Sequence, residues 1–310
     1  MSNLVLKNKS SKKEILIFIS IFIIGSIFRI GFGLFDTSDD LIWYVDPYPL
    51  EFDYIQVSRF GFPKELLFLP LKIFNSINIR IIFIGLLTSF LNTISIYFLV
   101  KNSNQRFTIY IGLIAILTIF FAKIDMHLVR QQISIYFFVI SICQNKLNIK
   151  SIIFALLSIV YHEAIVFLFG AFLISISFNR FSLNNLENKL FLSSIITNTI
   201  IYLMIFDVSI IFLILVSTMN RFLKTKFKED KFGNSFYIFQ LFLPFFYLDL
   251  NLEKYLIPTE IAIQRFIGFA ISYGFLILIG NEIIEKKNFK RSILITFLLS
   301  YILKSTLDII

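Results

Sequence analysis

Apolar runs long enough to cross a lipid bilayer recur along the whole of this 310-residue chain, and they constrain its fold more than any other feature. Hydrophobic residues make up 57% of the sequence and the mean hydropathy is +0.82, which excludes an ordinary soluble domain. A helix needs about 17–25 apolar residues to cross the hydrocarbon core of a membrane. We therefore expect one all-α, polytopic domain over residues 1–310, embedded in a lipid bilayer.

Nine spans fit the apolar pattern best, within a range of eight to eleven. We expect them at about 15–35, 79–100, 107–122, 130–145, 151–176, 190–219, 234–248, 259–281 and 292–309. Either 151–176 or 190–219 could instead consist of two half-helices, which would change the number of spans.

The longest stretch between spans is the loop 36–78. Its first part is acidic and aromatic, and its second part begins at Pro63, a helix-start signal that precedes an apolar run of about three turns. That run is too short to cross a membrane. We expect it to form a re-entrant or interfacial helix on the outer side.

The net charge of +9 reflects orientation in the membrane and does not indicate nucleic-acid binding. Five segments hold 17 of the 29 Lys and Arg but only five of the 20 acids: 1–14, 101–106, 144–150, 220–231 and 282–291. Loops rich in Lys and Arg stay in the cytoplasm. We therefore expect a cytoplasmic N-terminal tail over residues 1–14 and a C-terminus outside.

Two ionisable residues beside apolar runs are the first functional candidates. Arg130 opens the fourth span, and His162 lies near the middle of the fifth, next to Glu163. Charged groups inside a bilayer are costly, so they usually face a protein interior and have a function there. A guanidinium can bind two phosphate oxygens at once, and an imidazole can exchange a proton near neutral pH. The alternatives are an arginine that anchors a helix end and a histidine hydrogen-bonded inside the bundle.

Two further arginines lie about two turns inside the outer ends of their spans. Arg265 shares one helical stripe with Gly268 and Ser272, small residues that allow close helix packing, so we expect it to face the bundle. A structural salt bridge with a loop acid is the alternative role. Arg29 precedes Gly31 and Gly33, which allow the backbone to bend or to approach a neighbour closely.

The outer loop adds a carboxylate and aromatic side chains. Glu65 opens the expected re-entrant helix, where it either takes part in chemistry or stabilises the helix N-terminus. Tyr44, near Asp40, could stack on a sugar ring or belong to an interfacial aromatic belt. Only two histidines and one cysteine are present, so we expect neither a multi-histidine nor a thiolate metal site.

Taken together, these motifs resemble the EpsG-type branch of the Wzy-like bacterial polysaccharide polymerases, over roughly residues 15–280. The matching positions are Arg29-Ile-Gly31-Phe-Gly33 with Asp36 or Asp40 and then Tyr44; Glu65; Arg130-Gln131; His162; and Arg265-Phe266 with Tyr273. The chain departs from the family pattern in three places. The stretch DTSDDLIWY (36–44) replaces the family's Asp-Tyr pair, Leu66 stands where Pro is usual, and Glu163 stands where a small residue is common.

The resemblance implies a GT-C-like, metal-independent glycosyltransferase without a cofactor in the bacterial inner membrane. Its substrates would be oligosaccharides carried on undecaprenyl diphosphate, with a chain-length regulator and a flippase as further partners. Arg130, Arg265 and Arg29 would bind the diphosphate, His162 or Glu65 would act as general base, and Tyr44 and Asp40 would contact the glycan.

Two other function classes fit the same composition. A flippase for the lipid-linked saccharide would also need a cavity lined by arginines, although the chain shows no internal repeat. A membrane acyltransferase that modifies surface glycans could use an intramembrane arginine and histidine.

Overall fold

Every regular element in the described part of the chain is helical, in agreement with the expected all-α class. The computed structural model describes residues 12–35, 41, 45, 71, 73–102, 122, 125, 126, 128–144, 148–162, 165–180, 186–205, 208–222, 231–244, 266–274, 276 and 277. The helices are α1 (Lys12–Phe35), α3 (Ile77–Asn102), α5 (Val129–Ile142), α6 (Ile149–Tyr161), α7 (Ile165–Arg180), α8 (Leu186–Ile205), α9 (Val208–Phe222) and α10 (Lys231–Gln240). Residues 266–274, 276 and 277 are also helical and are called segment 266–277 below.

The predicted spans agree with these helices in most places that can be compared. The expected spans 15–35, 79–100 and 130–145 correspond to α1, α3 and α5. The spans 151–176 and 190–219 are each divided in two, into α6 and α7 and into α8 and α9. The span 292–309 and all of 107–122 except Ala122 lie outside the described residues, so the number of spans and the GT-C-like class stay predictions.

In the described part of the chain, two helices are long and apolar enough to cross a membrane by length and composition. They are Ile15–Phe35 within α1 and Ile77–Leu99 within α3, while α5, α6 and α7 contain shorter apolar stretches. The outward faces of the helices are apolar too, with large exposed side chains such as Leu16 (63%), Leu156 (57%) and Leu203 (61%). A soluble monomer rarely exposes contiguous apolar surface of this kind, and a helix that is apolar on all sides suits a protein core or a membrane.

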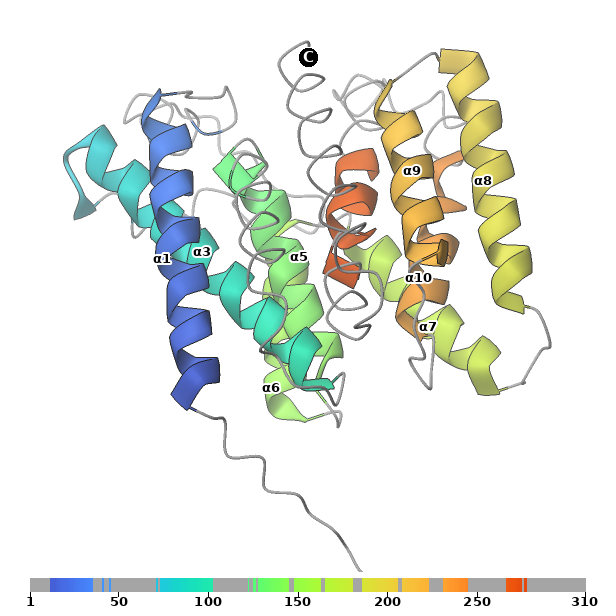
Figure 1. Ribbon diagram of the computed structural model, residues 1–310, viewed down its shortest axis with the longest axis horizontal. Coiled ribbons are helices and arrows are strands. Elements are labelled where there is room, and N and C mark those ends of the chain that lie inside the picture. The colour runs from blue at the N-terminus through green and yellow to red at the C-terminus, as the bar shows by residue number, and fades with distance from the viewer. Residues whose placement is uncertain are drawn as a thin grey trace, which may run out of the picture.

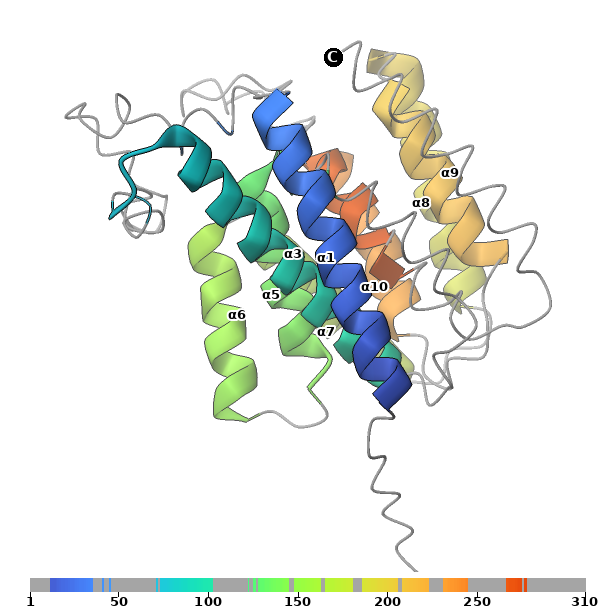
Figure 2. The same cartoon turned by 60° about the vertical axis from the view of Figure 1, so that its left-hand side comes forward.

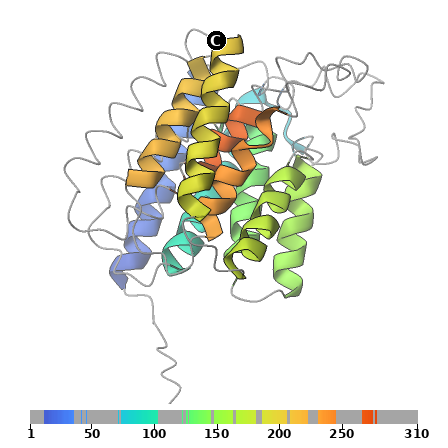
Figure 3. The same cartoon turned by 90° about the vertical axis from the view of Figure 1, so that its right-hand side faces the viewer.

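The helices form two groups joined by segment 266–277. In the first group α1 packs on α3, α3 on α5 and α5 on α6; in the second α7 packs on α10, α10 on α8 and α8 on α9. Figures 1 and 2 show α1, α3, α5 and α6 together, and Figures 1 and 3 show α8 and α9 side by side. Segment 266–277, red in Figure 1, runs between α5 and α9.

Buried polar groups connect the helices of the second group. Gln240 of α10 accepts hydrogen bonds at Oε1 from Asn198 Nδ2 of α8 (2.7 Å) and from Ser217 Oγ of α9 (2.9 Å). Asn220 Nδ2 of α9 donates to the Gly274 carbonyl (3.0 Å). Buried side-chain amides are costly unless they are hydrogen-bonded. These bonds therefore specify how α8, α9, α10 and segment 266–277 pack.

The outer loop 36–78 is held against the first group at a few described points. Leu41, Val45 and Leu71 are buried in the core. The buried Arg80 of α3 donates from Nε to the Phe74 carbonyl (2.8 Å) and from Nη1 to the Val45 carbonyl (2.9 Å). Of the expected re-entrant helix, only Leu71 and residues 73–78 are described, and Leu71 and Ile73 lie in a short 3-10 turn. The remainder of that prediction lies outside the described residues.

Glycines mark the closest approaches between helices. A Cβ atom on Gly33 of α1 would lie 2.6 Å from Ile81 Cγ2 and 2.6 Å from Met126 Cε, which confirms the close approach expected there. A Cβ atom on Gly31 would meet no atom of the described residues within 4 Å, so that glycine makes no close contact with them. In segment 266–277, a Cβ atom on Gly274 would lie 2.7 Å from both Phe236 Cζ and Val216 Cγ1.

We expect Gly274→Ala to destabilise the protein and Gly31→Ala to stabilise it. The added methyl at 274 meets a rigid ring and a β-branched side chain, and overpacking of this kind costs about 1–3 kcal/mol. At position 31 the methyl meets none of the described residues, and replacing a mid-helix glycine gains roughly 0.5–1 kcal/mol. Thermal unfolding of the two variants in detergent measures the difference. Equal melting temperatures would contradict the packing described at Gly274.

Candidate functional site

Paired serines set the antiparallel alignment of α5 and α6. Ser134 Oγ donates to the Ser158 carbonyl (2.7 Å), and Ser158 Oγ donates to the Ser134 carbonyl (2.8 Å). Two turns further along, Ser141 Oγ donates to the Ser151 carbonyl (2.8 Å). Small hydroxyl residues let two helices approach closely and hydrogen-bond across their interface. The two contacts have the same register, so the alignment holds along the shared length of the pair.

This alignment brings Arg130 and His162 to the same end of the helix pair. Arg130 lies four residues before Ser134, in the first turn of α5, and His162 lies four residues after Ser158. Because the helices are antiparallel, these equal offsets put the two residues at the same level. Both side chains are half-buried. Two candidates 32 positions apart in the sequence therefore share one end of the bundle.

Of the two alternatives for the span 151–176, the structure has the two half-helices, and His162 lies at the break between them. Helix α6 ends at Tyr161, and His162 has an extended backbone with φ −154° and ψ 113°. Its N–H donates to the Ser158 carbonyl (3.2 Å), and its carbonyl accepts from Ile165 N (3.2 Å) at the start of α7. The two adjacent polar residues His162 and Glu163 are the sign of this turn in the sequence. Helix periodicity therefore does not relate His162 to Glu163, which lies outside the described residues.

Segment 266–277 completes this end of the bundle. The rings of His162 and Phe269 meet edge to face, with centroids 4.7 Å apart. A Cβ atom on Gly268 would lie 2.9 Å from Gln131 Nε2, and Gln132 Nε2 donates to Ser272 Oγ (2.7 Å). These contacts confirm that Gly268 and Ser272 form a close-packing stripe, and the stripe faces the first turn of α5. The residues at this end, Arg130, Gln131, His162, Gly268 and Phe269, are called the end cluster below.

The first turn of α5 attracts negative charge. The residue before the helix is Leu128, whose side chain cannot cap it, and the turn contains no acidic residue. A helix N-terminus presents backbone N–H groups and a partial positive charge, which disfavours a cation and favours an anion. Arg130 adds a full positive charge there, and its buried Nε has no hydrogen-bond partner in the described part of the chain. An anion at this position would satisfy both the helix end and the guanidinium.

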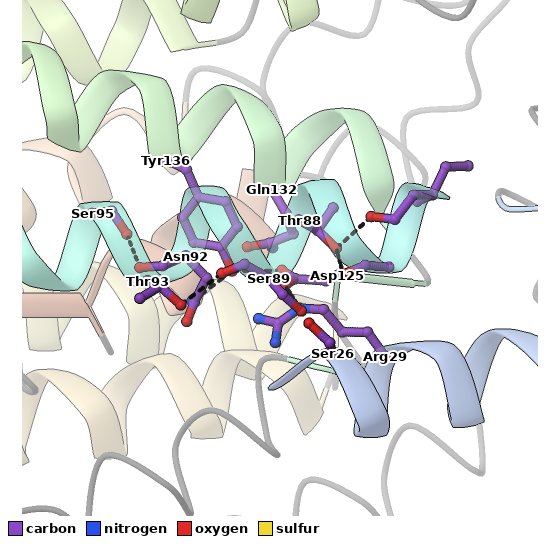
Figure 4. A network of polar contacts seen from close by, with 12 residues as sticks. Ser26, Arg29, Thr88, Ser89, Asn92, Thr93, Ser95, Asp125, Gln132 and Tyr136 are labelled. Carbon is purple, nitrogen blue, oxygen red and sulfur yellow. Dashed lines mark hydrogen bonds and ion pairs between the residues drawn. The ribbon is translucent and has the colours of Figure 1, made fainter. Parts of the chain in front are cut away.

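A second polar group lies inside the first helix group (Figure 4). Arg29 of α1 is fully buried, and its Nε donates to Asp125 Oδ2 at 2.5 Å. Tyr136 Oη of α5 donates to Asp125 Oδ1 (2.6 Å) and accepts from Asn92 Nδ2 of α3 (2.9 Å). We call these four residues the Arg29–Asp125 network. Arg29, a candidate from the sequence, is thus the partner of a buried carboxylate.

Asp125 is not among the candidates predicted from the sequence, although its position in the sequence is unusual. It is the only acid between Glu65 and Glu163. An isolated carboxylate in so long an apolar stretch requires a cationic partner if it is buried. What the sequence does not reveal is which arginine supplies that partner.

Several predicted site residues cannot be compared with the structure. Arg265, Glu65, Tyr44 and Asp40 lie outside the described residues, so the convergence of Arg265 with Arg130 stays a prediction. Within the described residues, no group of three His, Cys, Asp or Glu side chains could hold a metal ion.

No family model, curated protein or solved structure matches this chain. The likeness to the EpsG-type branch therefore depends on short motifs in the sequence. What the candidate site could bind or catalyse is therefore argued from the contacts of the end cluster and of the Arg29–Asp125 network.

Proposed function

We propose that this chain is an integral membrane glycosyltransferase that polymerises saccharide repeat units carried on undecaprenyl diphosphate. The growing glycan is transferred from its lipid carrier to the sugar end of the next lipid-linked unit, at the outer face of the bacterial inner membrane. The apolar outward faces of the described helices support a membrane location.

One observation carries the proposal: Arg130 and His162 lie at the same level of the α5–α6 pair. Glycosyl transfer from a diphosphate needs a cation for the leaving group and a base for the acceptor hydroxyl. Arg130, at an uncapped helix N-terminus, is suited to the first task. His162, half-buried and in contact with Phe269, is suited to the second.

The reaction needs neither a metal nor an oxidant. The bond between the anomeric carbon and the diphosphate oxygen breaks, and the diphosphate leaves with the electron pair. The acceptor hydroxyl attacks the anomeric carbon and transfers its proton to the base. Guanidinium groups stabilise the developing negative charge on the leaving group, as electrostatic catalysis requires.

The remaining candidates keep the roles that the resemblance implies. Arg265, three residues before Gly268 in the sequence, is proposed as the second diphosphate contact, and Arg29 as the third. Glu65 is the alternative base. Tyr44 and Asp40 are proposed to contact the glycan.

Deletion of the gene separates the three function classes. If the chain is a polymerase, the deletion strain accumulates single repeat units on lipid at the outer face of the membrane. Lipid-linked units retained on the inner leaflet would indicate a flippase, and full-length glycan lacking acyl groups would indicate an acyltransferase. Extraction of lipid-linked saccharides, with and without labelling of intact cells from outside, measures the position and length of the units. Either alternative result contradicts the proposed function.

A further inference from the structure

Among the described residues, one of the three nitrogens of the Arg29 guanidinium has a hydrogen-bond partner. The side chain is 0% exposed, and Nε donates to Asp125. Neither Nη1 nor Nη2 has a hydrogen-bond partner within the described residues. A buried guanidinium is costly unless its remaining donors find acceptors. The pairing with Asp125 thus accounts for the charge of Arg29 but leaves most of its donors unsatisfied.

The second oxygen of Asp125 binds a tyrosine and not the arginine. Tyr136 Oη donates to Oδ1 at 2.6 Å, and Asn92 in turn donates to the Tyr136 hydroxyl. A pair built only to neutralise charge would gain most from two parallel bonds between guanidinium and carboxylate. Here the carboxylate is shared between α1 and α5, and the buried Nη1 and Nη2 of Arg29 have no hydrogen-bond partner among the described residues. The edge that these two nitrogens form matches the spacing of two phosphate or carboxylate oxygens.

The network also lies close to the first turn of α5. Asp125 precedes Arg130 by five residues. The side chain of Met126 packs against Gly33 of α1, which lies one turn after Arg29. Ser89 of α3, whose buried Oγ also lacks a partner within the described residues, is one turn from Asn92. Arg29 and Ser89 thus give this part of the bundle buried polar atoms that have no partner among the described residues.

We propose that Asp125 is a positioning residue, which together with Tyr136 orients Arg29 so that its Nη edge binds phosphate oxygens of the diphosphate-linked substrate. This inference depends on the proposed function and adds a residue that the sequence motifs do not contain. Because no solvent reaches Arg29, substrate binding must displace side chains that cover it. Inside the bundle the low dielectric strengthens the interaction between guanidinium and phosphate.

The test compares the affinity for undecaprenyl diphosphate among variants of the full chain in nanodiscs, with undecaprenyl phosphate as the comparison ligand. The double variant Arg29→Met with Asp125→Asn removes both charges together, so no uncompensated buried charge is left. We expect it to keep the melting temperature of the wild type and to bind the diphosphate more weakly by about 100-fold or more, the loss of two charge-assisted bonds.

Two further variants distinguish positioning from stability. Tyr136→Phe frees one Asp125 oxygen, so we expect weaker diphosphate binding and a higher KM for the lipid-linked donor with little change in kcat. Asn198→Leu removes a buried hydrogen bond between α8 and α10; we expect it to lower stability without changing diphosphate affinity.

Two outcomes would overturn the inference, and only one of them would also overturn the proposed polymerase function. If the wild type prefers the diphosphate and the charge-free double variant binds it equally well, Asp125 and Arg29 form only a structural pair and the polymerase proposal stands. If the wild type shows no preference for the diphosphate over the monophosphate, the proposed function fails and this inference fails with it.

Discussion

Replacing Arg130 with lysine is expected to reduce glycan polymerisation by about 100-fold or more, the usual loss when one group that stabilises developing charge is removed. Lysine keeps the charge but lacks the planar fork that binds two phosphate oxygens, so the substitution is not conservative at such a site. Arg130 also lies at an uncapped helix N-terminus, where it gains little stability from its own helix. The loss should therefore appear in activity and not in folding. Glycan length on gels, together with protein level in the membrane, measures both.

Arg221→Lys is the matched control for this variant. Arg221 lies in the last turn of α9 and donates to Asn188 Oδ1 of α8, away from the end cluster. We expect wild-type glycan length and wild-type protein level. Full-length glycan in the Arg130→Lys strain would contradict the assignment of Arg130 to the leaving group, and a parallel loss in both variants would indicate a general effect on folding.

The sequence predicts helices well where a single apolar run has clear ends. Helix α1 matches its predicted span because basic residues precede the run and an acid follows it. The break between α6 and α7 was harder to predict, because the run is apolar before and after the His162-Glu163 pair and no proline or glycine marks the turn. In such a run hydropathy reports only that the residues avoid water. Whether the helix continues is determined by tertiary contacts.

The candidate site was predictable as a set of residues but not as an arrangement. Arg130 and His162 can be selected from the sequence, because ionisable side chains in apolar runs are energetically costly and usually have a function. Their shared level in the bundle depends on the register of Ser134 with Ser158, which pairs residues on different helices. A single sequence does not show that Ser134 pairs with Ser158. The partner of Arg29 escaped prediction for the same reason, because Asp125 lies 96 residues away along the chain.

Replacing His162 with glutamine is expected to lower kcat for glycan transfer by about 100- to 10,000-fold, the range that a general base contributes. Glutamine keeps a polar side chain of similar reach but cannot accept the proton of the acceptor hydroxyl. Binding of the lipid-linked donor should change little, because the diphosphate contacts come from arginines. The measurement is single-turnover transfer between defined lipid-linked units in nanodiscs, which separates kcat from KM.

The pH profile and a second variant identify the base. With His162 as the base, the pH dependence of the wild-type rate should be absent from the residual rate of His162→Gln. Glu65→Gln tests the alternative base in the same assay and should retain the wild-type pH profile. If the profile disappears in Glu65→Gln and persists in His162→Gln, the carboxylate of the outer loop is the base. His162 would then act at the end cluster only through its contact with Phe269.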